Sequence, residues 1–326
     1  KNRFFQVPHC NGMGYAMPEA HAAMRAAKAE GGWAVVSTEE CEIHPTGDIS
    51  PYVEARLWDE SDIPALALMC EKVHAHGALA AIELTHNGPT SSNLYSREVA
   101  IAPSHQPLKY GYPQQARAMT LRDIRDYRRW HRDAALRAKR AGFDIVYIYA
   151  AHDLSLAMHF LQQRRNHRSD EYGGSLENRV RLLRELIADT KEAVGDKCAV
   201  AVRFATEEFL GVDGVRESDA REVVQLLADL PEPSRRGRGL AGALGVLVVP
   251  LTALLVDRDP GLYLRAGYWH LAQFWECGLG GLLGWSAGRL AHAMESEGKR
   301  FSELGRRLPR VDLLDPASLE PFARQG

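Results

Sequence analysis

Residues able to do chemistry gather at the ends of five short apolar segments of the chain. These ends are Val7–Cys10, Thr38–Cys41, Glu83–Gly88, Tyr147–His152 and Arg203–Phe204. Together they hold a thiol, carboxylates, a phenol, imidazoles and a guanidinium. Such a density of titratable groups is typical of a polar pocket with a redox or acid–base task.

The segments that position these ends alternate between two types. Candidate strands, rich in β-branched residues, cover Arg3–His9, Trp33–Ile43, Ala78–Thr85, Phe143–Ala150 and Cys198–Phe204. Amphipathic stretches between them predict helices at Pro18–Glu30, Ser61–His76, Thr120–Ala141 and Leu176–Val194. Alternation with short turns predicts a parallel sheet with helical crossovers, and five successive βα units favour a TIM (β/α)8 barrel over a doubly wound sheet. In such a barrel the reacting groups lie where the strands end.

Helix boundaries carry their own signals. Thr120 and Asp123 have the spacing of a capping box, and Ser61 or Asp62 precedes Pro64 at another helix start. Gly142 stands where a helix should end before a strand.

Charge and cysteine content exclude several classes of protein. The chain has 40 basic and 42 acidic residues, so its bulk charge excludes a strongly basic nucleic-acid binder, and we expect no nucleic-acid partner. Five cysteines without a C-x-x-C pair argue against a disulfide framework and a Cys-only zinc site. A reducing, cytoplasmic location is therefore expected. No signal peptide is visible, and the N-terminus resembles a chain entered in mid-strand, so we expect a fragment.

The composition changes near Pro231-Glu232-Pro233. An uncharged stretch, Gly239–Val256, follows three arginines and includes a candidate strand at Gly245–Leu251. The stretch is at the short end of the roughly 17–25 residues that a membrane span needs, and glycines and a proline weaken it. Three interpretations of this stretch stay open: a membrane span, a buried hairpin of barrel strands, and a frame-slipped, non-native continuation. The membrane span is the one we least expect.

The segment Asn166–Arg179 reads Asn-His-Arg-Ser-Asp-Glu-Tyr-Gly-Gly-Ser-Leu-Glu-Asn-Arg. It resembles the N-x-R-x-D-x-Y-G-G-S-x-x-N-R signature of the old yellow enzyme family of FMN barrels. The pieces Lys1–Cys10, Ala29–Trp33 and Ala141–Tyr147 resemble the trimethylamine and dimethylamine dehydrogenase branch. The resemblance covers about residues 1–230. It divides the chain into an FMN-binding barrel portion, 1–232, and a Gly/Leu/Arg-rich continuation, 233–326, that does not match the family.

The resemblance implies how FMN would be held. Cys10 matches a cysteine that forms a thioether to carbon 6 of the flavin in the amine dehydrogenases. The alternative is a small buried cysteine with a packing role only. Val7, Pro8 and His9 would line the ring beside it. Glu83 matches a residue that meets the flavin pyrimidine. Arg203 matches a cation near flavin N1 that stabilises the reduced ring, or it forms a structural ion pair.

The resemblance also implies the reaction. Ene-reductases of the family carry H-x-x-H or H-x-x-N where this chain has Tyr149 and His152, the amine dehydrogenase form. A phenol bonded to an imidazole is expected to lose its proton more readily than a free tyrosine, and the pair would deprotonate a substrate ammonium. Hydride transfer to flavin N5 and hydrolysis of the imine would follow. Glu40 stands where the trimethylamine enzyme has an aromatic residue, which favours a secondary or primary amine, unless Glu40 pairs with a local arginine.

The family's later features are not recognisable. The sixth strand of the family carries a Trp-Asp pair and a catalytic aspartate that orients the histidine, and strands seven and eight bring glycine and arginine to the FMN phosphate. None of these is found, nor is the four-cysteine iron–sulfur motif, so an iron–sulfur cluster is not supported. We expect no metal site. The alternatives to amine oxidation are an NAD(P)H-dependent ene-reductase and a non-catalytic fragment unable to bind flavin. The electron acceptor is undetermined, and a homo-oligomer stays open.

Overall fold

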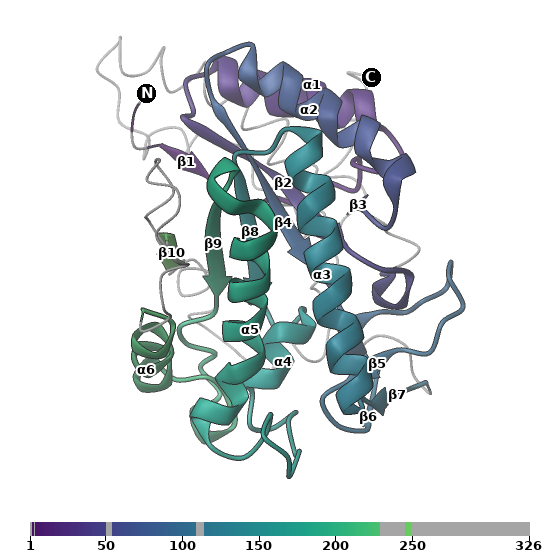
Figure 1. The fold of residues 1–326 in the computed structure, drawn as a ribbon, viewed down its shortest axis with the longest axis vertical. Coiled ribbons are helices and arrows are strands. Elements are labelled where there is room, and N and C mark those ends of the chain that lie inside the picture. Colours follow the sequence, from purple (N-terminus) through teal and green to yellow (C-terminus); the bar gives the residue numbers. More distant parts are fainter. Residues whose placement is uncertain (1, 3, 50–53, 109–113, 229–244, 249–326) are drawn as a thin grey trace, which may run out of the picture. The chain divides into compact units, whose positions relative to one another are not determined.

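The computed structural model describes residues 2, 4–49, 54–108, 114–228 and 245–248, all within one compact unit, Lys1–Cys277. Six parallel strands lie side by side in chain order (Figure 1): β1 (Phe5–Gln6), β2 (Val35–Glu42), β4 (Leu79–Thr85), β8 (Ile145–Ala150), β9 (Ala199–Phe204) and β10 (Gly245–Val248). The short β3 (Ala55–Arg56) pairs with the end of β2. An order without reversal is the one that a barrel requires.

Helices connect the successive strands: α1 (Pro18–Glu30), α2 (Ile63–His74), α3 (Leu121–Ala141), α5 (Leu176–Val194) and α6 (Glu217–Ala228). Each packs against the next along the chain, and α3 and α5 run in front of the sheet in Figure 1. A further short helix, α4 (Leu156–Leu161), follows β8 directly. A small second sheet of β5 (Ile101–Ala102), β6 (Gln106–Pro107) and β7 (Gln115–Ala118) lies between β4 and α3 in the sequence. Its strands are too short to carry a hydrophobic period, and the sequence did not predict them.

The two faces of the parallel sheet bury different side chains. Ile82, Leu84, Val146, Ile148 and Val202 belong to the large core that the sheet shares with the helices. The alternate residues Ala81, Ile145, Tyr147 and Ala201 form a smaller cluster on the other face. Side chains of a strand alternate between faces, so the residues that continue this second row toward the strand ends also point away from the helices.

Most predicted boundaries are confirmed. The helices at Pro18–Glu30 and Leu176–Val194 have the predicted limits. Thr120 and Asp123 form the capping box of α3, and Gly142 closes that helix in the left-handed conformation, with φ of 101°. Ser175 caps α5 by accepting a hydrogen bond from the Asn178 backbone N–H.

Two strand predictions need comment. The strand predicted over Arg3–His9 was too long, because β1 covers only Phe5–Gln6; Pro8 has no N–H to extend the ladder. Gly245–Val248 of the uncharged stretch forms β10, which pairs in parallel with β9. Residues 239–244 and 249–256 lie outside the described part, as does the boundary predicted at 232/233. No helix among the described residues is long and apolar enough to cross a membrane.

Candidate active site

The second row of the sheet becomes polar where the strands end. On this row the apolar residues Ala81 and Ile145 give way to Glu83 and Tyr149. Tyr149 is in register with Arg203 of β9. Parallel strands end at one edge, so three neighbouring strands deliver a carboxylate, a phenol and a guanidinium to the same place.

A β-bulge brings Glu40 into this row. The register between β2 and β4 shifts between Ser37, which pairs with Ala81, and Glu40, which pairs with Glu83. The extra residue reverses the alternation of β2. Glu40 therefore stands beside Glu83, and burial together with the Glu83 charge raises the Glu40 pKa to about 8.

Arg203 links four of the predicted site residues. Its Nη1 donates to both carboxylate oxygens of Glu83, at 3.0 and 3.1 Å, and reaches the Pro8 carbonyl oxygen at 3.5 Å. Its Nη2 lies 3.5 Å from His152 Nε2, and its guanidinium carbon lies 5.5 Å from the centre of the Tyr149 ring. Burial alone would lower the Arg203 pKa, but the Glu83 charge outweighs it and the pKa is raised. The guanidinium thus stays charged in a buried site, paired with a carboxylate that is only 1% exposed.

The loop that carries Cys10 is fixed on both sides. After Cys10, the Glu39 carboxylate accepts hydrogen bonds from the backbone N–H groups of Asn11, Gly12 and Gly14, at 2.8, 2.9 and 2.6 Å. Before Cys10, the fully buried Arg25 of α1 donates to the His9 carbonyl oxygen. The position of Cys10 is therefore set by two buried ionisable side chains.

A cluster of acidic groups surrounds Cys10. Pairing of β3 with β2 brings Glu54 next to Glu40, and one carboxylate oxygen of each lies within 4.8 Å of Cys10 Sγ. Burial and then the charge of Glu54 raise the Cys10 pKa. Burial likewise raises the Glu54 pKa, with the neighbouring carboxylates adding to it. Glu40 and Glu54 each keep one buried oxygen, Oε2, without a hydrogen-bond partner in the described part of the protein.

Tyr149 and His152 form a hydrogen-bonded pair. The phenol oxygen lies 2.6 Å from His152 Nδ1. The sequence predicted that Tyr149 loses its proton more easily than a free tyrosine. This prediction is wrong for the protein as described, because burial raises the Tyr149 pKa above its ordinary value. Tyr149 therefore holds its phenol proton more tightly than a free tyrosine does, and it shares a hydrogen bond with His152.

The donor set at Arg203 fits the pyrimidine edge of a flavin. That edge presents oxygen and nitrogen acceptors and one N–H donor, which complement a guanidinium beside a carboxylate. Arg203 Nε is buried and lacks a hydrogen-bond partner within the described ranges. In the family the FMN phosphate is held by strands seven and eight, and residues 249–326 lie outside these ranges. Among described residues, Cys10, Glu40 and Glu54 form the one group of three or more His, Cys, Asp or Glu with the spacing of a metal site.

The structure brings most of the predicted residues together. Arg203 joins Pro8, Glu83, Tyr149 and His152, while Cys10 and Glu40 lie in the adjoining acidic cluster. Val7 and His9 flank Pro8, and their backbone groups bond to the side chain of Gln6 and to the carbonyl of Thr38. The roles of these residues toward a flavin or substrate stay predictions.

Sequence reasoning missed Glu54 and the support that Glu39 gives. Glu54 is joined to the site only by the pairing of the two-residue β3, for which the sequence holds no signal. Glu39 was visible as a strand-end carboxylate, but its backbone partners come from a loop whose path depends on the whole sheet.

Residues 1–241 match the NADH:flavin oxidoreductase / NADH oxidase family. Dimethylamine dehydrogenase from Hyphomicrobium sp. (strain x) is 40% identical over 221 residues, which are 66% of this chain and 30% of that protein. The solved structure of histamine dehydrogenase from Rhizobium sp. 4-9 is similar with a TM-score of 0.69 and 49% identity, over 71% of this chain and 34% of that one. The chain thus spans about a third of the length of these two relatives.

An old yellow enzyme homologue from Zymomonas mobilis is similar with a TM-score of 0.60 and 29% identity, over 71% of this chain and 67% of that one. The predicted barrel fold and the recognition of the amine dehydrogenase branch are confirmed by these likenesses. Membership of the family implies FMN as the cofactor. The matched residues contain every element of the site described above, and the chain belongs to the NADH:flavin oxidoreductase / NADH oxidase family.

Proposed function

We propose that the site oxidises a small primary or secondary amine that carries a second hydrogen-bond donor or cationic group. The observation that carries this proposal is the pair of buried carboxyls, Glu40 and Glu54, each with an unpartnered oxygen, next to the Tyr149–His152 pair. Two acceptors favour a substrate with several N–H groups over a fully methylated amine, which has at most one. The likeness to histamine dehydrogenase supports a substrate with a primary amine and a second nitrogen group.

Tyr149 and His152 would prepare the amine by taking a proton from it. The ammonium donates a hydrogen bond to the phenol oxygen, and its proton passes to that oxygen as the phenol proton moves to His152 Nδ1. Tyr149 never becomes a free phenolate in this exchange, which agrees with its raised pKa. Glu83, paired with Arg203, offsets the guanidinium charge that lies 3.5 Å from His152 Nε2. The free amine then has the lone pair that loss of a hydride from its Cα requires.

FMN, when bound, supplies the oxidant that accepts the hydride equivalent from the substrate Cα. Arg203 and Glu83 would bind the pyrimidine edge and orient the ring, and Cys10 would stand at its flank, from where we propose a thioether link. The oxidised substrate leaves as an imine, which water hydrolyses.

The test combines an amine panel with a matched pair of tyrosine variants. The full chain, loaded with FMN, is assayed with an artificial electron acceptor and with histamine, dimethylamine or trimethylamine. We expect turnover to fall in that order, and Tyr149→Phe to lower kcat by roughly 10²-fold or more, because proton transfer by a positioned group contributes that much. Tyr172→Phe, whose hydroxyl bonds to Glu185 in another part of the fold, should keep wild-type turnover.

An ene-reductase is the alternative within the family. It would reduce an activated alkene with NAD(P)H and would not bleach its flavin with any amine. Alkene reduction without amine oxidation would overturn the proposal, and failure to bind FMN at all would favour a non-catalytic fragment.

A further inference from the structure

The turn that carries His152 has an unusual backbone. The Leu154 N–H donates to the Ala151 carbonyl and closes a four-residue turn whose two central residues, His152 and Asp153, have φ of 59° and 54°. Positive φ at both central positions is the geometry of a type I′ turn, for which Asn-Gly is the preferred pair. Neither His nor Asp is glycine, so the turn persists only if its surroundings hold it.

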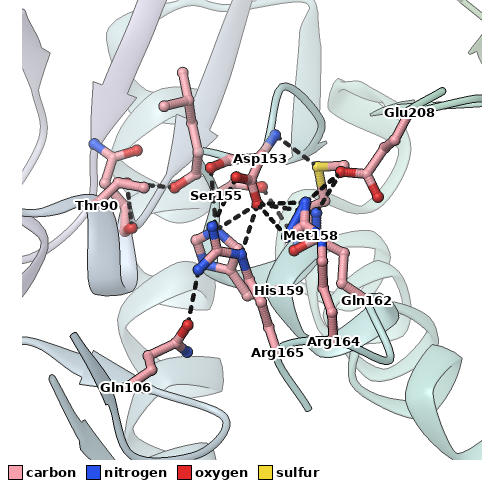
Figure 2. A network of polar contacts seen from close by, with 12 residues as sticks. Thr90, Gln106, Asp153, Ser155, Met158, His159, Gln162, Arg164, Arg165 and Glu208 are labelled. Atoms are coloured by element: carbon pink, nitrogen blue, oxygen red, sulfur yellow. Dashed lines mark hydrogen bonds and ion pairs between the residues drawn. The ribbon is translucent and has the colours of Figure 1, made fainter. Parts of the chain in front are cut away.

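The carboxylate, the backbone carbonyl and the backbone N–H of Asp153 each have a hydrogen-bond partner (Figure 2). Its carboxylate accepts two parallel hydrogen bonds from Arg165, from Nε and Nη2 at 2.7 Å each. Gln162 donates to the same carboxylate at 2.9 Å and Arg164 at 3.3 Å. The Asp153 carbonyl lies 3.2 Å from His159 Nε2, and its N–H donates to Met158 Sδ. All five partners come from α4 and the residues directly after it.

The same arginines tie the turn to two other parts of the fold (Figure 2). Arg164 donates to Glu208 at 2.7 Å, and Glu208 belongs to the loop that follows Arg203 and β9. Arg165 donates to Gln106 of β6 at 2.8 Å. The bidentate, charge-assisted contact of Arg165 with Asp153 fixes orientation as well as distance. It holds the backbone of the turn, and with it the Cα–Cβ direction of the neighbouring His152.

We propose that Asp153, gripped by Arg165 and Arg164, is a positioning residue that holds His152 against the Tyr149 hydroxyl. The inference rests on the proposed function only for the consequence that His152 takes a proton; the geometry that it explains is independent of any substrate. It assigns a task to a cluster that the sequence analysis did not single out.

The test uses two conservative variants and one matched control. Asp153→Asn keeps a residue that tolerates positive φ and one acceptor oxygen, but loses the charge. Arg165→Lys keeps the charge but loses the paired geometry. Asp170→Asn breaks the Arg168–Asp170 ion pair, which lies in the same loop region but contacts none of these residues. Circular dichroism checks that each variant folds.

The first readout is the ionisation and tautomer of the His152 ring, followed by ¹⁵N NMR of the histidine-labelled full chain. The His152 signals are assigned by their loss in His152→Gln. We expect the wild type and Asp170→Asn to show one tautomer, and Asp153→Asn and Arg165→Lys to show an averaged pair of ring nitrogens. The second readout is turnover. Asp153→Asn and Arg165→Lys should each lower kcat by roughly tenfold or more, with KM changed less than about twofold.

The two readouts separate this inference from the proposed function. Unchanged His152 signals in both Asp153→Asn and Arg165→Lys, or the same change in Asp170→Asn, would overturn the positioning role even if the wild type oxidises amines. Shifted His152 signals in a protein that oxidises no amine would support the positioning role of Asp153 and overturn the proposed function instead.

Discussion

At the scale of single residues, the acidic cluster is the feature with the clearest consequence for pH. Burial and then Glu83 raise the Glu40 pKa from its ordinary value of 4.5 to about 8. Between these two values the folded protein keeps a proton that the unfolded chain releases. The contribution of Glu40 to stability is therefore complete below pH 4.5 and is lost as the pH rises through 8.

Glu40→Gln should remove this dependence, because an amide does not titrate. We expect the wild-type Tm to fall between about pH 5 and about pH 9 and the variant to fall less over the same range. Thermal unfolding followed by circular dichroism measures both slopes. Glu217→Gln, on the exposed face of α6, should keep the wild-type slope. Identical slopes for the wild type and Glu40→Gln would show that Glu40 does not hold its proton in the folded state.

The reactivity of Cys10 is set by the same neighbours. Burial and the Glu54 charge raise the Cys10 pKa, and the thiolate is the form that attacks. We expect yellow colour that stays with the acid-denatured protein to form slowly at neutral pH and faster as the pH rises. Glu54→Gln, which removes the first of the neighbouring charges, should speed its formation. Cys10→Ala should release all colour into the supernatant, and retained colour in this variant would exclude Cys10 as the point of attachment.

At the scale of elements, the loop from Cys10 to Gly14 depends on one buried carboxylate. Glu39 accepts three backbone N–H groups, and Gly14 approaches it so closely that an added Cβ would lie 2.5 Å from Oε1. Glu39→Ala leaves these donors without a partner and should lower the free energy of unfolding by about 3 kcal/mol, since a single unsatisfied buried group costs about 1–3 kcal/mol.

Gly14→Ala separates the role of the loop from the loss of the Glu39 charge. No positive φ constrains Gly14, so the methyl group acts only by overlap with Glu39 and Ala55. It should destabilise the protein in urea unfolding in the same direction as Glu39→Ala. Glu60→Gln, at an exposed carboxylate in the turn that precedes α2, serves as the control for both. Free energies of unfolding within about 0.5 kcal/mol of the wild type would contradict the role given to this loop.

The elements also show what could be predicted from the sequence. Helix limits such as Pro18–Glu30 and the Thr120–Asp123 capping box follow from contacts within a few residues, and these predictions were confirmed. The bulge in β2 follows from the pairing of two strands forty residues apart, and no local pattern marks it. Without that bulge Glu40 would face the helices, so its place beside Glu83 came from the family resemblance alone.

At the scale of the whole chain, the site is a meeting of distant segments. Arg203 contacts residues of β1's loop, β4 and the turn after β8, and each strand end was predicted separately from its own residues. That these ends converge follows from parallel order, which the alternation of strands and helices predicted. Glu54 and Asp153 escaped prediction because their importance lies in partners elsewhere in the fold, which their own neighbours in the sequence do not reveal.

The pairing of β10 with β9 gives the last prediction, because it tests whether the uncharged stretch supports the site. In the register of these strands Val246 pairs with Val202 and Leu247 pairs with Arg203. Alternate residues of a parallel strand bond to a given neighbour, so proline at one of these two positions removes a hydrogen bond to β9, and proline at the other does not. One of Val246→Pro and Leu247→Pro should therefore melt at a lower temperature and bind FMN more weakly, since β9 carries Arg203. Flavin fluorescence quenching and thermal unfolding measure the two effects. If both variants match the wild type in each assay, the backbone of β10 contributes nothing to the placement of Arg203.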